Sequence, residues 1–214
     1  LFSNLPEDGI AFVNVEDPFI KKFHSHARKI RYSFEIDCEN QAMDLGFDNS
    51  GKAEFHLNGI KYSMSVPGNG FARSALAAIV VALEFGITPY EIDKKLKSFK
   101  SKEGRMEQIN IRGITIFNDS YNANPSSVRN SIETIGKIDC SGKRILVFGD
   151  MLELGKNTKT YHVAIAGLLE ENGFSVLFTI GELAKVISDS ARHIATSKHF
   201  RQYKELIIQL LKTI

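Results

Sequence analysis

The sequence predicts an α/β protein built in two parts, and three observations lead to this prediction. Strand-like and helix-like segments alternate from residue 114 to residue 212, a pattern typical of βαβ units with a mostly parallel, Rossmann-like sheet and flanking helices. A hairpin signal followed by two helical runs occupies residues 52–98. Between these regions, the segment 99–113 is charged, contains Gly104 and lacks a clear apolar period, which indicates a linker. We therefore predict two domains, 1–107 and 108–214.

The first part combines strands with two helices. Asn58-Gly59 is the strongest short signal for a hairpin turn, and the Ala- and Leu-rich run before Gly86 is typical of a buried helix that ends at a glycine. Thr88 and Glu91 form a capping box around Pro89, which marks the start of the next helix. The expected strands are 9–15, 28–36 and the hairpin 52–66, with a turn or helix at Pro18, and the expected helices are 72–85 and 88–98.

The second part is expected to alternate strictly. The strands are 114–118, 144–149 and 175–180, and the helices are 125–135, 160–171, 182–191 and 201–212. In one parallel sheet with right-handed crossovers, the loops that follow successive strands emerge at the same edge. The polar stretches "NDSYNANP" (118–125) and "GDMLELG" (149–155) are therefore expected to face one cleft.

Composition and charge exclude several classes of protein. Apolar residues make up 43% and charged residues 24% of the chain, and the net charge is +2, with Lys and Arg spread along it. These values predict a soluble globular protein with no nucleic-acid or membrane-surface partner. Cys38 and Cys140 lie far apart, which indicates neither a disulfide framework nor structural zinc and suits the cytoplasm. His24 and His26 form a pair without a third ligand, so we expect no metal site, and the longest apolar run is too short to cross a bilayer.

The stretch "NDSYNANP" has two interpretations. Asn, Asp, Ser and Pro are ordinary turn residues, and Asp119 could cap the helix that follows. A carboxylate at a strand end can also accept two hydrogen bonds from ribose hydroxyls, with neighbouring Asn amides as donors and acceptors. Two such loops at one sheet edge favour a binding site.

The motifs also resemble a known family. "FNDSYNANPSSV" followed after a helix by "ILVFGDMLELG" is similar to the C-terminal domain of Mur ligases, and "EGRMEQ" resembles the junction between their central and C-terminal domains. Residues 9–98 look like the last part of the central ATPase domain. Among the family members, "SYNANP" is most similar to those that add D-alanyl-D-alanine to UDP-N-acetylmuramoyl-tripeptide in peptidoglycan precursor synthesis.

This resemblance implies an ATP-dependent amide ligase that uses Mg²⁺ and forms an acyl phosphate. We also expect a monomer, although the sequence carries no clear mark of the oligomeric state. It implies nucleotide contacts for Arg105, Asp119 and Asn14, and contacts with the peptide substrates for Ser120, Asn122, Asn124 and His162. A structural role for His162 is an equal alternative, and Arg105 taken alone reads as a solvated linker charge. No catalytic residue is assigned in this chain.

The chain departs from the family pattern in two ways. Gly70, Phe71 and Ser74 stand where the family has His, Asn and Asn near the nucleotide; Phe71 could stack on a purine or belong to the core. No G-x-x-x-x-G-K-[ST] loop occurs, and the chain begins at Leu1 without Met, so we expect a longer gene product and no turnover by residues 1–214 alone. Two other functions remain open: a non-catalytic binding module, or an amide ligase of the same superfamily with a different carrier.

Overall fold

The computed structural model describes residues 2–214, and these residues form two compact units. The first unit ends at Lys100 and the second begins at Ser101. The boundary expected between residues 107 and 108 therefore falls inside the second unit. The segment after Ser101 belongs to that unit because it is tied there by hydrogen bonds: the Tyr121 N–H donates to Gly104 O at 2.9 Å, and the Met106 N–H donates to Asp119 Oδ1 at 3.0 Å.

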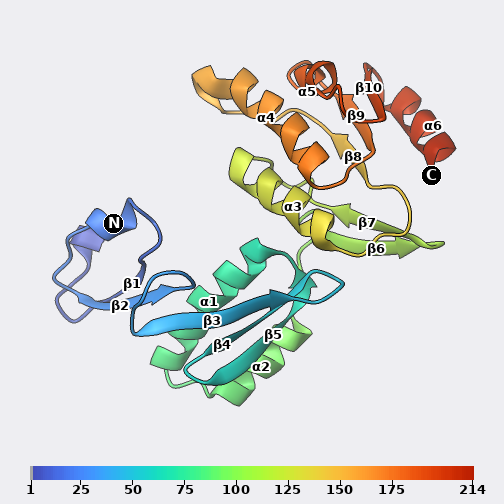
Figure 1. The fold of residues 1–214 in the computed structure, drawn as a ribbon. Helices are drawn as coiled ribbons and strands as arrows, with labels where there is room; N and C mark the ends of the chain where they lie inside the picture. Colours follow the sequence, from blue (N-terminus) through green and yellow to red (C-terminus); the bar gives the residue numbers. More distant parts are fainter. Residues whose placement is uncertain (1) are drawn as a thin grey trace. The chain divides into compact units, whose positions relative to one another are not determined.

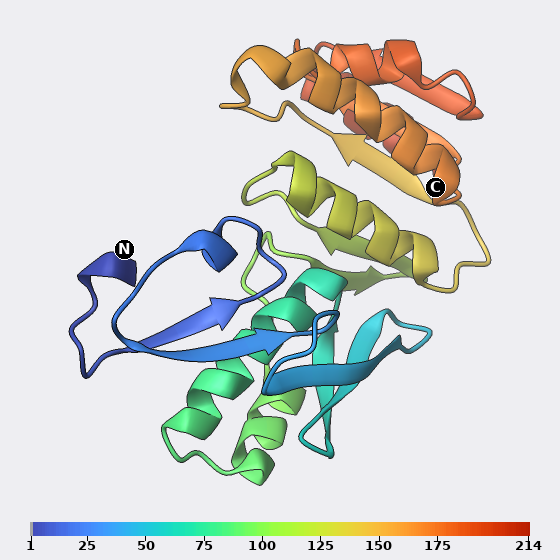
Figure 2. The same ribbon diagram turned by 60° about the vertical axis from the view of Figure 1, so that its left-hand side comes forward.

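The first unit is a five-stranded sheet with two helices (Figures 1 and 2). The strands lie in the order β1-β2-β3-β4-β5; β1 and β2 and then β2 and β3 are parallel, whereas β3, β4 and β5 are antiparallel. The elements are η1 (Phe2–Asn4), β1 (Ile10–Asn14), η2 (Ile20–Lys22), β2 (Arg28–Ser33), β3 (Asn40–Phe47), β4 (Lys52–Leu57), β5 (Ile60–Pro67), α1 (Asn69–Glu84) and α2 (Pro89–Ser98).

One face of this sheet carries the core of the first unit. Along β4, Ala53, Phe55 and Leu57 are buried and alternate with more exposed polar residues, the period expected of a strand covered on one side. Leu76 and Ile79 of α1 join the same apolar cluster. Burial of this face supplies the main favourable free energy for folding of the unit.

Local sequence signals determine the ends of the two helices. Thr88 caps α2 in a capping box with Glu91, and Pro89 occupies the first helical position, as expected. Past the end of α1, Gly86 has φ +79°, and its N–H donates to Leu83 O at 3.0 Å while the Ile87 N–H donates to Ala82 O at 3.0 Å. This is a Schellman ending, and a residue with a Cβ would be strained at Gly86.

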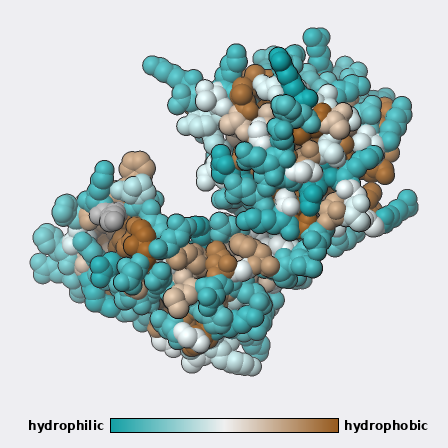
Figure 3. Space-filling model, in the orientation of Figure 1, coloured by the Kyte–Doolittle hydropathy of each residue, from teal (hydrophilic) through white to brown (hydrophobic). Residues whose placement is uncertain are grey.

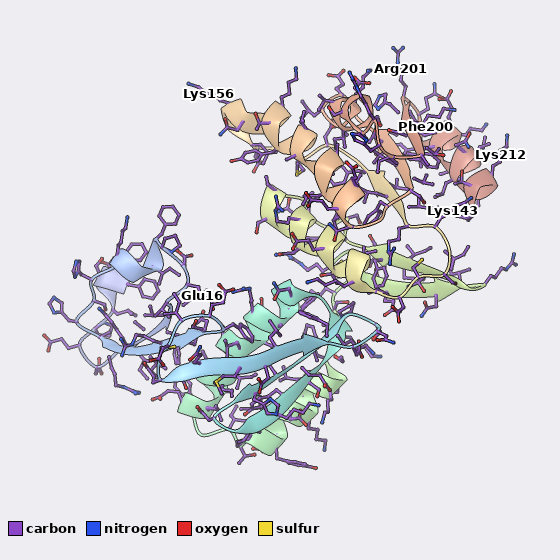
Figure 4. All side chains as sticks on the ribbon, in the orientation of Figure 1. Glu16, Lys143, Lys156, Phe200, Arg201 and Lys212 are labelled. Atoms are coloured by element: carbon purple, nitrogen blue, oxygen red, sulfur yellow. The ribbon has the colours of Figure 1, made fainter. Side chains whose placement is uncertain are left out.

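Glu16, labelled in Figure 4, joins three segments of the first unit. Its carboxylate accepts hydrogen bonds from Ser33 Oγ at 2.9 Å and from the backbone N–H groups of Phe34 and Glu35, and it pairs with Arg73 of α1. Burial would raise the pKa of Glu16, but these hydrogen bonds and the charge of Arg73 outweigh it and lower the pKa.

The Glu16→Gln substitution is expected to destabilise the first unit at neutral pH, by an amount that shrinks as the pH falls. The folded-state pKa lies below the unfolded one, so the stabilisation is present above the ordinary glutamate pKa of about 4.3 and is lost as the pH falls through the folded pKa. Urea unfolding of both proteins from pH 7 downward measures this difference, with Glu7→Gln, an exposed glutamate, as control. A difference that is independent of pH would contradict the assignment.

The second unit contains a parallel sheet and a separate hairpin. Strands β8, β9 and β10 are parallel in the order β10-β9-β8, and β6 and β7 form an antiparallel pair. The elements are β6 (Glu107–Ile111), β7 (Ile114–Asn118), α3 (Pro125–Lys137), β8 (Ile145–Phe148), η3 (Gly155–Asn157), α4 (Thr158–Glu171), β9 (Val176–Ile180), α5 (Lys185–Ser190), β10 (Thr196–Phe200) and α6 (Tyr203–Thr213).

The parallel sheet of this unit is covered on both faces (Figure 1). Leu177 of β9 belongs to the apolar cluster with α3, α4 and α5, whereas its neighbours Val176 and Phe178 belong to the cluster with Leu206 of α6. Four successive residues of β9 are therefore buried, which is typical of a central parallel strand between two helical layers. This is the Rossmann-like arrangement predicted from the alternation of elements.

The two-stranded sheet corrects the prediction for residues 107–118. The segment read as a linker contains strand β6, and β7 pairs with β6 rather than with the parallel sheet. The turn explains the pairing: Arg112 and Gly113 both have positive φ, 50° and 82°, as a two-residue type I′ hairpin turn requires. The prediction that both polar loops leave one sheet edge is therefore wrong, since β7 and β8 belong to different sheets.

Besides β6, two further strands, β3 and β10, were not predicted, for identifiable reasons. In β3, the register shifts between Met43 and Gly46, and Asp44 has φ 55°, so the bulge interrupts the alternation that would mark a strand. In β10, the sequence Thr-Ser-Lys-His-Phe is mostly polar because the strand lies at an edge of its sheet. The predicted helix 182–191 begins later, at Lys185.

The visible surface is mostly polar. In the space-filling view, hydrophilic residues cover most of each unit, and apolar residues appear as separate patches (Figure 3). Within residues 2–214, no helix combines the length and the apolar character needed to span a membrane.

Candidate functional site

Asp119 follows β7 directly and uses both carboxylate oxygens within the protein. Oδ1 accepts the Met106 N–H at 3.0 Å, and Oδ2 accepts the hydroxyl of Ser131 in α3. The side chain therefore ties the start of the second unit to the loop after β7 and to a helix. A carboxylate has about four acceptor positions, so these two bonds leave capacity for a ligand.

Arg105 lies on a turn that is attached to the same loop. Its neighbours Gly104 and Met106 both have positive φ, 71° and 48°. A Cβ on Gly104 would lie 3.1 Å from Tyr121 N, so the close approach of the two backbones, together with the positive φ, favours glycine. The Arg105 guanidinium carbon lies 4.2 Å from the centre of the Tyr121 ring. Among residues 2–214, no carboxylate is within ion-pair distance of Arg105, so its charge is available to an anion.

The other polar residues of the loop have different positions. Ser120 Oγ donates to Asn118 Oδ1 at 2.7 Å, an ordinary turn contact on the surface. Asn124 caps α3: its Oδ1 accepts the Ser127 N–H at 2.9 Å. Asn122 is exposed. The structure thus brings Arg105, Asp119, Ser120 and Asn122 together on one loop cluster, with Asn124 at its end.

His162 is buried in the second unit and has a structural position. Its side chain is fully covered, Nδ1 lies 2.8 Å from Thr158 O, and Nε2 accepts the Met151 N–H at 3.1 Å. A carbonyl oxygen only accepts and an N–H only donates, so the neutral ring carries its proton on Nδ1. The structure favours the structural alternative for this residue, because the side chain is fully covered and both ring nitrogens are engaged within the protein.

The loop "GDMLELG" is held by its own contacts. Met151 is fully buried in the cluster of α3, α4 and α5, and Ala123 of "NDSYNANP" packs against the same cluster. Asp150 Oδ1 accepts the Ala184 N–H at 2.7 Å, and a Cβ on Gly181 would lie 2.4 Å from that oxygen. A shared core, rather than a shared sheet edge, positions both loops within the second unit.

Asn14 lies in the first unit, at the end of β1. Its Oδ1 accepts the Glu16 N–H at 3.0 Å, which is a local turn contact. Phe71 is partly buried and packs against the core of that unit, with its ring centre 6.0 Å from that of Phe99, which favours the core interpretation of Phe71. Residues 2–214 contain no group of three or more His, Cys, Asp or Glu side chains placed to hold a metal ion.

Sequence reasoning missed two residues of this loop cluster. The motif "NDSYNANP" predicts no role for Tyr121, although an aromatic residue two positions after a candidate carboxylate is a signal worth testing. Ser131 stands four residues after Ser127 in α3, and no local pattern links it to Asp119 across 12 positions.

Comparison with known proteins agrees with the resemblance noted in the motifs. Residues 104–214, more than half of the chain, match the family described as "Mur ligase, glutamate ligase domain". The curated UDP-N-acetylmuramoyl-tripeptide--D-alanyl-D-alanine ligase of Bacillus subtilis is 30% identical over 213 residues, which cover 97% of this chain and 46% of that protein. The enzyme of the same name from Buchnera aphidicola is 32% identical over 98% of this chain and 46% of its own length.

A solved structure shares the fold. The MurF ligase from Thermotoga maritima in complex with ADP has a TM-score of 0.84 and 22% identity, covering all of this chain and 49% of its own. The chain spans about half the length of the curated relatives it matches. The match to the family over more than half of the chain shows that this chain belongs to the Mur ligase family.

Proposed function

We propose that the protein containing this chain is an ATP-dependent amide ligase that joins D-alanyl-D-alanine to UDP-N-acetylmuramoyl-tripeptide in peptidoglycan precursor synthesis. The observation that carries the proposal is the likeness over 97% of the chain to a curated ligase with this name. The order of residues in "NDSYNANP" and the unpaired charge of Arg105 beside it give further support.

The reaction has two steps. The terminal carboxylate of the tripeptide attacks the γ-phosphorus of ATP, which forms an acyl phosphate and ADP. The free amine of D-alanyl-D-alanine then attacks the acyl carbon, and inorganic phosphate leaves as the amide forms. The protein contributes positioning and electrostatic stabilisation to phosphoryl transfer, because the transferred group brings its own reactivity.

The loop cluster of the second unit suits the nucleotide in this reaction. Arg105 has a permanent charge and a planar fork of donors, which match phosphate oxygens, and we assign it to the ATP phosphates. Asp119 retains acceptor positions for the ribose hydroxyls. Ser120, Asn122 and the free amide group of Asn124 offer hydrogen bonds to the acceptor dipeptide. Asn14 is assigned to the nucleotide on resemblance alone, and His162 is removed from the substrate contacts.

Mg²⁺ is also part of the proposal. The ion neutralises phosphate charge when it is bound. The described residues contain no cluster that fits it, so no step in this chain is assigned to the metal. We further propose that the enzyme is cytoplasmic and monomeric.

The test is a product assay with purified full-length gene product. ATP, UDP-N-acetylmuramoyl-tripeptide and D-alanyl-D-alanine should give the pentapeptide product, with one ADP and one phosphate per amide, as measured by mass spectrometry and a phosphate assay. Single amino acids such as D-glutamate serve as alternative acceptors, and residues 1–214 alone serve as an inactive control. Product with another acceptor or carrier would favour a different amide ligase of the superfamily.

A non-catalytic binding module is the second candidate. It is favoured by one observation: Phe71 is engaged with Phe99 and the core, and Gly70 and Ser74 lack long polar side chains. This candidate predicts nucleotide or peptide binding by calorimetry without any product. Absence of product together with measurable binding would select it over the ligase.

A further inference from the structure

Among residues 2–214, the Arg105 guanidinium has no hydrogen-bond partner, and only the backbone N–H of Arg105 donates, to Lys102 O at 3.1 Å. A long arginine side chain has several rotatable bonds, and fixing it upon ligand binding costs conformational entropy. Its contact with an anion is therefore strengthened by any group that holds the guanidinium in place beforehand. The contact found in the structure is the Tyr121 ring, with its centre 4.2 Å from the guanidinium carbon.

Backbone hydrogen bonds hold Arg105 and Tyr121 next to each other. On one side of Arg105, Gly104 O accepts the Tyr121 N–H at 2.9 Å; on the other, the Met106 N–H donates to Asp119 Oδ1 at 3.0 Å. The turn that carries Arg105 is thus attached at both ends to the segment that carries Tyr121. The positive φ of Met106, 48°, is an unfavourable conformation for a residue with a side chain, and it persists because these bonds hold it.

The Tyr121 ring packs little against the hydrophobic core. Tyr121 is 68% exposed, and its phenol ring can be removed without opening a cavity. An exposed aromatic ring against an unpaired arginine is better explained by the orientation of that arginine than by packing.

We infer that Tyr121 is a positioning residue, which holds the Arg105 guanidinium over its ring and so presents it to the phosphates of ATP. This inference rests on the proposed function, since the anion is ATP only if the protein is the ligase. Tyr121 acts through Arg105 and does not itself contact substrate.

The kinetic test is a double-mutant cycle in the full-length enzyme. Tyr121→Leu is expected to lower kcat/KM for ATP about fivefold and to leave the KM for D-alanyl-D-alanine unchanged. Tyr121→Phe should keep the wild-type kcat/KM for ATP, because the face of the aromatic ring remains. In an Arg105→Ala background, Tyr121→Leu should have no further effect. Tyr203→Leu, which alters another exposed tyrosine of the same unit, is the control. Full additivity of the two substitutions, or equal effects of Leu and Phe, would overturn the inference.

A second measurement tests the contact between Arg105 and the Tyr121 ring independently of enzymatic activity. In the 214-residue chain, the side-chain protons of Arg105 should show an upfield ring-current shift by NMR that disappears in Tyr121→Leu and remains in Tyr121→Phe; a shift that persists in Tyr121→Leu overturns the positioning role. If Arg105→Ala leaves ATP kinetics unchanged in an active ligase, the roles of Arg105 and Tyr121 both fail while the ligase function stands. If the wild-type protein makes no product, both the proposed function and the inference that depends on it are wrong.

Discussion

The His162→Ala variant is expected to lose about 3 kcal/mol of the free energy of unfolding of the second unit. The His162 ring is fully buried, so its truncation leaves a cavity. The truncation also removes the acceptor of the backbone N–H of Met151, a residue whose side chain is fully buried as well. It also removes the contact of Nδ1 with Thr158 O inside α4. A buried donor without a partner costs more than an average hydrogen bond contributes, which makes this substitution severe.

Urea denaturation followed by circular dichroism measures this loss, because the chain has no tryptophan to report it. Amide hydrogen exchange in α4 assigns the change to the second unit. The matched control is His193→Ala, a histidine of the same unit whose side chain is 73% exposed, and it should change stability by less than about 0.5 kcal/mol. Equal losses in the two variants would refute the structural role of His162.

The Asp119→Ala variant is expected to have two effects. It leaves the Met106 N–H without its acceptor and removes one of the two acceptors of the Ser131 hydroxyl, which still lies 2.9 Å from Ser127 O. This should cost about 1–3 kcal/mol in the second unit and speed exchange of the Met106 amide. In the full-length ligase proposed above, it should also raise the KM for ATP by about tenfold or more, because Asp119 is proposed to accept hydrogen bonds from the ribose.

Two variants separate the effects. Asp119→Asn keeps one carbonyl oxygen that can accept the Met106 N–H, so stability should recover more than ATP binding does. Asp139→Ala removes an exposed carboxylate of the same unit and should leave both readouts unchanged. If Asp119→Asn restores stability and also has a wild-type KM for ATP, then Asp119 is a structural residue and the ribose contact is wrong.

Local patterns predicted most of the elements of this protein. The capping box of Thr88 and Glu91, the turn at Asn58-Gly59 and the ending at Gly86 depend on residues within a few positions of one another, so the sequence states them directly. The strands β8 and β9 and their helices followed from alternation. The hairpin at Arg112-Gly113 was also local, and its alternating isoleucines could have revealed it.

By itself, then, the sequence determined the class of fold, the family motifs and the candidate loop, because these depend on composition, periodicity and residue order. The tertiary structure decided which polar side chains are available and which are already engaged. Asp119 accepts a hydrogen bond from Ser131, which lies 12 positions away, and the Arg105 guanidinium lies over the Tyr121 ring. His162 accepts a hydrogen bond from the Met151 N–H inside the core. No periodicity encodes such contacts, because packing and hydrogen bonding between distant segments create them, and the free energy of each depends on its surroundings.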